Sequence, residues 1–247
     1  MTDKLSIIMR NGETTLNRER KLQGTMDVPL SKLGEKQAQQ AGVRLSNSCY
    51  SRAYASDLSR ARVTCELILE KNMCNPPPIV TTPKLRERNF GCMEGLPFDD
   101  ALAQAKAAGV SWMQFQPKGS ETMGEVQERM IAFFKELCQS VYDKSHNNNG
   151  EEQAKDNETI DKNAVELENC EVSESILVVS HGAALRTLFT QFHTNYRCPV
   201  PGGNTDDVNQ ISPNTGLTEY IVRYSPKKYE MHCVRLYDGA HIEGLEE

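Results

Sequence analysis

Short apolar runs alternate with amphipathic helical segments along this 247-residue chain, and the alternation constrains its fold more than any other feature. The runs at 5–9 and 176–179 are expected to be strands, and the second is a continuous apolar run typical of a buried parallel sheet. Between the runs, apolar residues recur at helical spacing. The expected helices are 31–45, 57–69, 101–108, 121–142 and 182–192. This order predicts an α/β fold, a three-layer sandwich with a mostly parallel central sheet and helices on both faces.

Helix caps and the C-terminal strands refine this expectation. Ser31 and Asp57 stand where helices begin, and each is expected to act as an N-cap. Further strands are expected at 53–55, 79–80, 220–222 and 233–236. The last two are expected to pair through a turn at 225–228.

The charge of the chain is concentrated in one acidic segment. Residues 143–174 hold ten acidic and three basic residues, a net charge of −7, whereas the whole chain carries −6. The segment also has few large apolar residues, so we expect a disordered insertion within a single domain spanning 1–247. Such a segment could recruit a protein partner. The rest of the chain is close to neutral and lacks the basic footprint of a nucleic-acid-binding protein.

The N-terminal residues lack the pattern of a signal peptide, and no apolar run approaches the roughly 20 residues that a membrane span needs. We therefore expect a cytoplasmic protein without membrane insertion, a location compatible with nuclear or mitochondrial association. Eight cysteines are scattered without Cys-x-x-Cys spacing. They are expected to be reduced and mostly buried thiols, and a disulfide framework is the less favoured alternative.

Two expected strands are each followed by polar side chains and then a glycine. Arg10 and Asn11 precede a glycine after the first strand, and His181 precedes Gly182 after the strand at 176–179. Ligands of parallel α/β sheets bind beyond the carboxyl ends of the strands, and a helix N-terminus that follows favours an anion. Arg60, at the start of another helix, could supply a second guanidinium to fork onto a phosphate.

Glu87 lies between two arginines in a loop, where a carboxyl group could donate a proton to a leaving alcohol. Each of these residues alone is more often structural, and only their order and shared place at strand ends favour a single anion site. Three further cations are expected to be solvated surface charges. They are Lys106, Lys118 and Arg186.

At these positions the chain resembles the histidine phosphatase superfamily, also called the phosphoglycerate mutase-like family. The six matching stretches are Arg10-x-Gly12-Glu13-Thr14-x-x-Asn17, Gln23-Gly24, Pro29-Leu30-Ser31-x-x-Gly34, Ser56-x-Leu58-x-Arg60-Ala61-x-x-Thr64, Glu87-Arg88-x-x-Gly91-x-x-Glu94-Gly95 and Ser180-His181-Gly182. They occur in the family's order between residue 5 and about residue 216. The stretches 119–122, 133–138 and 213–216, with the acidic insertion, are similar to the TIGAR branch of fructose-2,6-bisphosphatases.

The resemblance implies a phosphoglycerate mutase-like fold and a phosphohydrolase of sugar phosphates that needs neither metal nor other cofactor. The implied substrate is fructose 2,6-bisphosphate or a related ester, and its hydrolysis would restrain glycolysis. By resemblance, Arg10, Arg60 and His181 would hold the phosphoryl oxygens. Glu87 would protonate the leaving oxygen and then activate water. The residues that would line the substrate side are Asn17, Gln23, Gly24 and Gly182.

Position 11 departs from the family, whose members carry there the histidine that attacks the phosphoryl group. A carboxamide nitrogen is not a usable nucleophile, although Asn11 can still donate a hydrogen bond to phosphate. We therefore expect binding with turnover lost. Three explanations stay open: a substitution made to trap a ligand, a natural pseudo-phosphatase that senses a sugar phosphate, and slow direct hydrolysis through Glu87 and water.

Two other functions stay beside the phosphatase. One is a binding module whose acidic insertion recruits a partner. The other, ranked last, is a mutase of three-carbon acids, which would need the same histidine.

Overall fold

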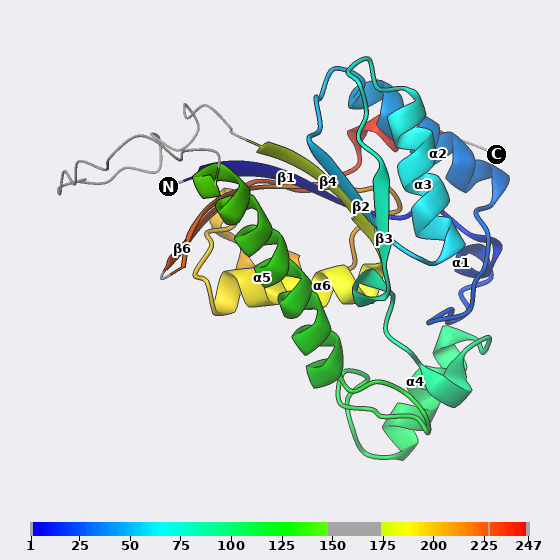
Figure 1. Cartoon of the computed structure of the whole chain (residues 1–247). Helices are drawn as coiled ribbons and strands as arrows, with labels where there is room; N and C mark the ends of the chain where they lie inside the picture. The colour runs from blue at the N-terminus through cyan, green and yellow to red at the C-terminus, as the bar shows by residue number, and fades with distance from the viewer. Residues whose placement is uncertain (1, 148–173, 227, 246–247) are drawn as a thin grey trace.

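The computed structural model describes residues 2–147, 174–226 and 228–245. Within these residues, six strands form one sheet in the order β3-β2-β4-β1-β5-β6 (Figure 1). The strands are β1 (Thr2–Arg10), β2 (Arg52–Ser56), β3 (Ile79–Thr82), β4 (Glu174–Ser180), β5 (Leu217–Ser225) and β6 (Lys228–Asp238). Strands β1 to β4 pair in parallel, and β5 is antiparallel to both of its neighbours. The sheet is therefore mostly parallel, as the sequence predicts.

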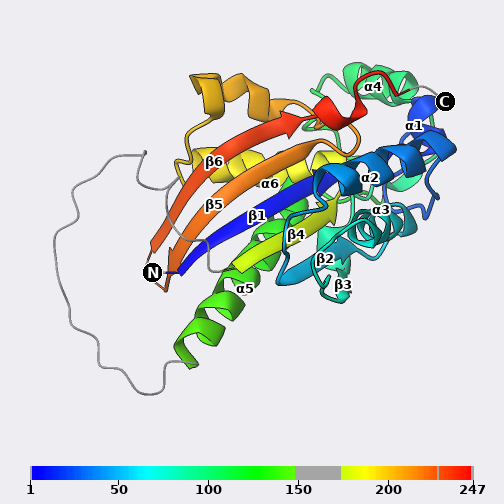
Figure 2. The same cartoon turned by 90° about the horizontal axis from the view of Figure 1, so that it is seen from above.

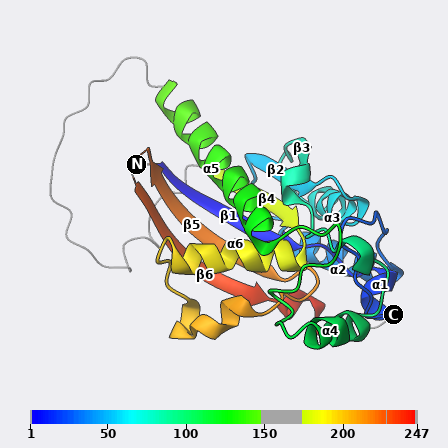
Figure 3. The same ribbon diagram turned by 90° about the horizontal axis from the view of Figure 1, so that it is seen from below.

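Helices cover both faces of this sheet and complete the three layers. The helices α2 (Lys32–Arg44) and α3 (Ser59–Glu70) pack on one face, and α5 (Met123–Asn147) and α6 (Gly182–Thr194) pack on the other (Figures 2 and 3). Strand β4 serves both cores because alternate side chains point to opposite faces. Ile176 and Val178 join the core under α5 and α6, whereas Leu177 and Val179 join the core under α2 and α3.

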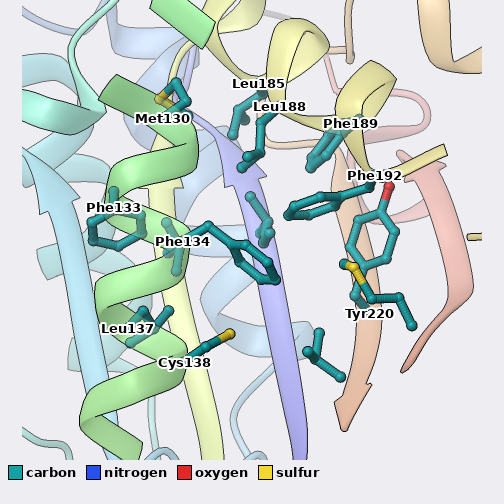
Figure 4. Packing of buried hydrophobic residues seen from close by; sticks show 14 of the residues in the cluster. Met130, Phe133, Phe134, Leu137, Cys138, Leu185, Leu188, Phe189, Phe192 and Tyr220 are labelled. Carbon is teal, nitrogen blue, oxygen red and sulfur yellow. The ribbon is translucent and has the colours of Figure 1, made fainter. Parts of the chain in front are cut away.

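The larger core lies between α5, α6 and the sheet, and Figure 4 shows its aromatic side chains meeting there. Phe134 of α5 contacts Phe192 of α6, with 4.6 Å between ring centroids. Phe192 in turn packs edge-on against Tyr220 of β5, at 5.1 Å. Burial of each large apolar side chain stabilises the fold by about 1.5–3 kcal/mol. This core therefore fixes α6, whose first residues follow the end of β4.

One of the two predicted helix caps is confirmed and the other is wrong. Ser31 accepts a hydrogen bond from the Gly34 amide at 3.0 Å, as an N-cap does. The next helix begins only after Leu58, which has no capping side chain. The Ser59 amide donates instead to Asp27, which comes from a distant loop, at 2.7 Å. Asp57 is drawn into an ion pair with Arg86, also at 2.7 Å, so it does not cap α3.

A third, smaller core belongs to a cap that lies over the carboxyl ends of the strands. It contains α4 (Phe98–Ala107), which Figure 1 shows apart from the sheet and beyond the N-terminal end of α5. Leu22, Phe90 and Met93 are buried in it, with Trp112 packed against them. The short elements near the cap and along the C-terminal half are α1 (Thr15–Arg18), η1 (Pro83–Leu85), η2 (Gly91–Met93), η4 (Pro201–Gly203), η5 (Thr205–Asn209) and η6 (Ala240–Ile242).

The predicted bounds of the acidic insertion are too wide. Residues 143–147 complete the last turn of α5, and residue 174 begins β4. Regular hydrogen bonding extends into both ends because α5 and β4 still pack there, and Lys144 pairs with Glu174 at 2.9 Å. The remaining part of the insertion, 148–173, lies outside the described residues.

The expectation that all cysteines are reduced is corrected by a disulfide between Cys49 and Cys74. Each cysteine follows the end of a helix, α2 or α3, and these helices pack side by side. Hydrogen bonds already join the two loops, since the Met73 amide donates to the Ser46 carbonyl at 2.8 Å. Four further thiols are buried as expected, and the Cys92 thiol is exposed. In the described part of the chain, no helix is both long and apolar enough to cross a membrane.

Candidate active site

Three segments that are distant in sequence meet at the carboxyl edge of the sheet. Arg10 and Ser180 are paired at the ends of β1 and β4, and the Asn11 amide donates to the Ser180 carbonyl at 2.9 Å. His181 is therefore the next residue beside Asn11. Strand β2 lies on the other side of β4, and the helix that follows it brings in Arg60. Neighbouring parallel strands thus place the predicted groups together.

A cavity of about 330 Å³ opens at this edge, between the strand ends and the cap. All the predicted site residues line it. They are Arg10, Asn11, Asn17, Gln23, Gly24, Arg60, Glu87, His181 and Gly182. Their placement is as the sequence predicts, while their individual roles stay predictions.

Arg60 is more fully engaged with the protein than the sequence suggests. The residue is 2% exposed, and its guanidinium donates to the Met26 and Gly24 carbonyls at 2.7 and 2.8 Å. Its Nε donates to Nδ1 of His181 at 3.2 Å. Burial lowers the pKa of Arg60, and the carboxylates of Glu87 and Asp27 act in the opposite direction. Three of its five N–H groups are thus used, so it positions the loop and His181 and keeps two donors for a ligand.

Arg10 is better placed to grip an anion. Its Nη1 donates to the Ser212 carbonyl at 2.7 Å, which leaves four N–H groups for a ligand. Burial lowers the pKa of Arg10, and Glu87 partly opposes this shift. With its remaining donors in the cavity, this guanidinium suits bidentate binding of a phosphoryl group.

His181 lines the cavity and has one ring nitrogen without a partner in the described part of the chain. Burial, assisted by the charges of Arg60, Arg129 and Arg10, lowers its pKa well below 6.5, so the ring is neutral at pH 7. Because an arginine always carries its Nε proton, we assign the Nδ1 lone pair to the bond from Arg60. The single ring proton then lies on Nε2, which is buried and has no partner in the described part of the chain. This N–H can donate to a phosphoryl oxygen.

Asn11 lies at the floor of the cavity and is 4% exposed. Its amide nitrogen donates to the Gly12 carbonyl at 2.7 Å. Its oxygen lies 3.1 Å from Nδ1 of His181, the nitrogen that already accepts a hydrogen bond from Arg60. One N–H of the carboxamide stays available to a ligand, but no atom of it offers a nucleophilic lone pair.

Glu87 caps the helix that follows the site. Its carboxylate accepts from the backbone amides of Ala183 and Ala184, both at 2.9 Å, and from its neighbour Arg88 at 2.8 Å. Glu87 therefore already occupies two of the amides at the N-terminus of α6, while Gly182, the first residue of the helix, lines the cavity. That this helix end favours a bound anion stays a prediction.

Gly12, in the loop that follows β1, is required for packing. The Gly12 amide donates to Oγ1 of Thr64 at 3.0 Å, and that hydroxyl donates to the Arg60 carbonyl at 2.6 Å. A Cβ at Gly12 would lie 2.5 Å from the carbonyl oxygen of Gly34, so only glycine lets the loop approach α2. Gly24 is equally constrained, because its φ is +54° and a Cβ there would meet Glu94.

Asn17 and Gln23 are oriented by Thr14. The Asn17 oxygen accepts from the Thr14 amide at 3.0 Å, and the Gln23 oxygen accepts from the Thr14 hydroxyl at 2.9 Å. Their NH₂ groups have no acceptor among the described residues and remain available on the wall of the cavity. These amides can donate hydrogen bonds to the hydroxyl or phosphoryl oxygens of a ligand.

The sequence reasoning missed part of the cavity wall. Arg186 was expected to be a solvated charge, but it is half-buried and lines the cavity. Its place four residues after Gly182 on one helix puts both on the same face, a signal that was present in the sequence. The expectation holds for Lys106 and Lys118, which are exposed. Trp112 comes from the cap and adds an aromatic wall, and no sequence pattern had singled it out.

In the described part of the chain, no group of three or more His, Cys, Asp or Glu side chains could hold a metal ion. The cations that line the cavity are guanidinium and ammonium groups, those of Arg10, Arg20, Lys21, Arg60 and Arg186.

Comparison with known proteins gives consistent results. A family model described as histidine phosphatase superfamily (branch 1) matches residues 6–148. Fructose-2,6-bisphosphatase TIGAR from Bos taurus is 34% identical over 268 residues, covering 100% of this chain and 99% of the relative. The same enzyme from Mus musculus is 34% identical, with 97% and 96% coverage.

Solved structures share the fold. Phosphoglycerate mutase from Bacillus anthracis superposes with a TM-score of 0.73 at 22% identity, covering 98% of this chain and 96% of that one. A mycobacterial glucosyl-3-phosphoglycerate phosphatase superposes with a TM-score of 0.69 at 21% identity, with 96% and 99% coverage. At these identities the likeness bears on the fold alone.

Proposed function

Because this chain belongs to the histidine phosphatase superfamily, we propose that its cavity binds a sugar phosphate as a fructose-2,6-bisphosphatase does and that Asn11 has removed most of its turnover. The scaffold is that of a phosphoric monoester hydrolase. The part that is missing is the group that would accept the phosphoryl moiety.

The groups that would hold a phosphoryl group are present at one end of the cavity. Arg10 offers four N–H groups, and His181 offers a neutral Nε2–H that has no other partner in the described residues. Arg60 adds two N–H groups and positive charge. Fixed donors of this kind stabilise the charge of a phosphoryl group both when it is bound and when it is transferred.

The covalent reaction of the family needs one further atom. A histidine nitrogen at position 11 would form a bond to phosphorus while the bond from phosphorus to the ester oxygen breaks. Glu87 would give a proton to that oxygen and then take one from the water that hydrolyses the phosphohistidine. At Asn11 the nitrogen lone pair is delocalised into the carbonyl, so the first bond does not form. This buried carboxamide at the cavity floor is the observation that carries the proposal.

Fructose 2,6-bisphosphate is the proposed ligand because relatives named fructose-2,6-bisphosphatase match this chain over almost its full length. A turnover-competent form would lower the concentration of this ester and so restrain glycolysis. The present chain would instead sequester it, in the cytoplasm.

Restoring the missing nucleophile tests this proposal. We expect the unmodified chain to release phosphate from fructose 2,6-bisphosphate at a negligible rate and Asn11→His to raise that rate at least about 100-fold, as expected for regaining covalent catalysis. Asn11→Ala is the control and should stay inactive. Acid-labile labelling from a phosphate-labelled ester should appear only in Asn11→His. Equal rates for the unmodified chain and Asn11→His would contradict the proposal.

A sensor without catalysis is a second candidate, favoured by the same Asn11. If it operates, calorimetry should detect the ester bound to the unmodified chain, and deletion of 148–173 should abolish partner binding while leaving ligand affinity unchanged. Slow direct hydrolysis through Glu87 predicts a small residual rate that Glu87→Gln removes. A mutase would require Asn11→His to move phosphate between positions of a three-carbon acid.

A further inference from the structure

We infer that His241, near the C-terminal end of the chain, is a positioning residue for the candidate active site. It does not line the cavity, but through the hydroxyl of Thr215 it fixes the loop that carries Arg10 and Asn11. The inference rests on the proposed function only for the ligand that this loop would hold. The contacts that support it lie within the protein itself.

Thr215 joins the loop after β1 to the segment that precedes β5. Its amide donates to the carbonyls of Arg10 and Asn11, at 3.1 and 3.4 Å. The same segment also accepts the Arg10 side chain, whose Nη1 donates to the Ser212 carbonyl at 2.7 Å. Residues 212–215 therefore position both the backbone and the guanidinium of Arg10. A shift of this segment would move the group that is best placed to grip an anion.

The backbone of Thr215 has a conformation that its residue type disfavours. Its φ is +54°, in the left-handed region, and the residue is fully buried. For a β-branched residue this φ is a genuine outlier, and it persists only where surrounding contacts enforce it. The hydrogen bonds of the Thr215 hydroxyl are therefore expected to help hold the segment in place.

His241 supplies one of these hydrogen bonds from another element. Its Nε2 lies 3.1 Å from Oγ1 of Thr215, and that hydroxyl donates to the Asn214 carbonyl at 2.7 Å. Because the hydroxyl proton is used by Asn214, we assign the other bond as one donated by Nε2–H of His241 to Oγ1. The short helix η6, which carries His241, follows β6 and contacts α2 (Figure 2).

Arg44 of α2 keeps the proton of His241 on the nitrogen that faces Thr215. Its Nη1 lies 3.4 Å from Nδ1 of His241, and an arginine can only donate, so Nδ1 accepts. The same Nη1 donates to Oδ1 of Asp238 at 3.0 Å, which anchors the guanidinium. Burial and the charge of Arg44 lower the pKa of His241, whereas Asp238 and the bond to Thr215 act in the opposite direction. The neutral ring, with its proton on Nε2, therefore predominates at pH 7.5.

These hydrogen bonds run in one direction, from Arg44 through His241 and Thr215 to the Asn214 carbonyl. Each donor meets an acceptor, so each of the four groups has one preferred orientation. The series connects α2 and the C-terminal segment to the loop after β1. Because His241 reaches this loop only through Thr215, it acts by positioning and takes no part in the phosphoryl chemistry.

Substitution of His241 in the otherwise unmodified chain tests the inference. Calorimetry at pH 7.5 would measure the affinity for fructose 2,6-bisphosphate, and urea denaturation would measure the free energy of unfolding. We expect His241→Leu, which has no donor, to weaken binding about 3-fold to 10-fold, the factor that corresponds to one hydrogen bond. His241→Gln places an NH₂ donor near the position of Nε2 and should restore the affinity to within about 2-fold.

His146→Leu is the matched control, since His146 is an exposed histidine near the end of α5. Its neighbour Lys144 pairs with Glu174 at the start of β4, the end of that strand opposite to the candidate site. The control should leave the affinity unchanged.

A double-mutant cycle tests whether His241 acts through Thr215. Thr215→Val removes the hydroxyl and keeps the β-branched shape, so it should weaken binding at least as much as His241→Leu does. His241→Leu added to Thr215→Val should then cause little further loss, because the hydrogen bond between the two residues is already absent. Additive losses would overturn the route through Thr215.

Hydrogen exchange separates this inference from the proposed function. In the ligand-free protein, NMR should find that the Thr215 amide exchanges faster in His241→Leu than in the unmodified chain or in His241→Gln. If the unmodified chain binds no sugar phosphate, the proposed function fails, and exchange at Thr215 alone decides the inference. Unchanged exchange in His241→Leu would overturn the inference. A loss of stability without a loss of affinity, or equal weakening by His241→Leu and His241→Gln, would also overturn it.

Discussion

Two side chains, those of Arg60 and Asn11, approach the same ring nitrogen of His181, and this geometry shows how Asn11 affects the site. Arg60 lies 3.2 Å from Nδ1 and the Asn11 oxygen lies 3.1 Å from it, yet a neutral imidazole has only one lone pair or one proton to offer there. With the Arg60 bond satisfied, the Asn11 oxygen faces a nitrogen without a proton. Asn11 therefore fits the cavity floor by size but leaves its oxygen poorly satisfied.

Thr64 supplies the residue-scale test of the loop that carries Arg10 and Asn11. Its hydroxyl is fully buried and accepts the Gly12 amide at 3.0 Å, so Thr64→Val would leave that N–H without an acceptor. We expect a loss of about 1–3 kcal/mol in the free energy of unfolding, measured by urea denaturation. Thr194→Val, at an exposed site on α6, is the control and should cost less than about 0.5 kcal/mol. Equal costs for the two variants would contradict this role of Thr64.

Most of the secondary structure could be predicted from the sequence because it follows from local patterns of apolar residues. Apolar alternation and helical spacing indicated every strand of the sheet and the four helices that cover it, and Ser31 identified one helix start. The missed features depend on groups that are distant in sequence. Asp57 failed as a cap because Arg86, from another loop, competes for its carboxylate.

The sequence predicted the candidate site to a similar extent. Arg10, Arg60 and His181 each follow a strand of the parallel part of the sheet, so their positions in the sequence were enough to predict that they meet at one edge. By contrast, the capture of the α6 amides by Glu87 and the half-buried state of Arg186 depend on how the cap packs, which no local pattern reports.

The N-terminus of α6 gives a test at the scale of elements, because one residue affects stability and binding in opposite directions. Glu87→Gln would replace a charged acceptor of three backbone amides with a neutral amide that has one oxygen. We expect the free energy of unfolding to fall by about 1–2 kcal/mol. Phosphate affinity should rise, since a negative charge leaves the cavity. Thermal melts and calorimetry would measure the two effects, and a parallel fall in both would contradict this reading.

An ion pair between α2 and β6 predicts that the stability of the fold depends on pH. Arg44 holds the carboxylate of Asp238, with Nη1 3.0 Å from Oδ1, and Arg235 lies 3.2 Å from Oδ2. Hydrogen bonding from Arg44 lowers the pKa of Asp238 from 3.8 to about 2. A depressed folded-state pKa means that the stabilisation is complete well above pH 3.8 and is lost as the pH falls toward 2.

Asp238→Asn should therefore cost about 1 kcal/mol at pH 7, after allowance for screening by solvent. Its difference from the unmodified chain should shrink between pH 4 and pH 2, because the unmodified carboxylate is then protonated. Urea denaturation at pH 7, pH 4 and pH 3 would measure the trend. A difference that stays constant over this range would assign the effect to packing rather than to charge.

At the scale of the whole molecule, one end of α3 contributes to the candidate site and the other end leads to the disulfide. The helix begins with Arg60 in the cavity, and its chain reaches the Cys49–Cys74 disulfide after the last turn, a helix length of about 18 Å away. The sequence separation of 25 residues implies that the disulfide restricts the unfolded chain and stabilises the fold by about 3 kcal/mol. The sequence alone favoured reduced thiols, because the spacing of two cysteines does not reveal that their helices pack together.

Cys49→Ser should lower the free energy of unfolding by about 2–4 kcal/mol without reductant, and the loss should disappear when both proteins are fully reduced. Because Arg60 lies at the opposite end of α3, the affinity for fructose 2,6-bisphosphate should stay within 2-fold of the unmodified chain. Cys92→Ser removes an exposed free thiol and is the matched control, with no change in either quantity. Thiol titration of the unfolded protein should find two fewer reactive groups before reduction than after it. Equal thiol counts would mean that the two cysteines are not joined in solution, and a fall in affinity in Cys49→Ser would mean that the bridge helps to position the cavity through α3.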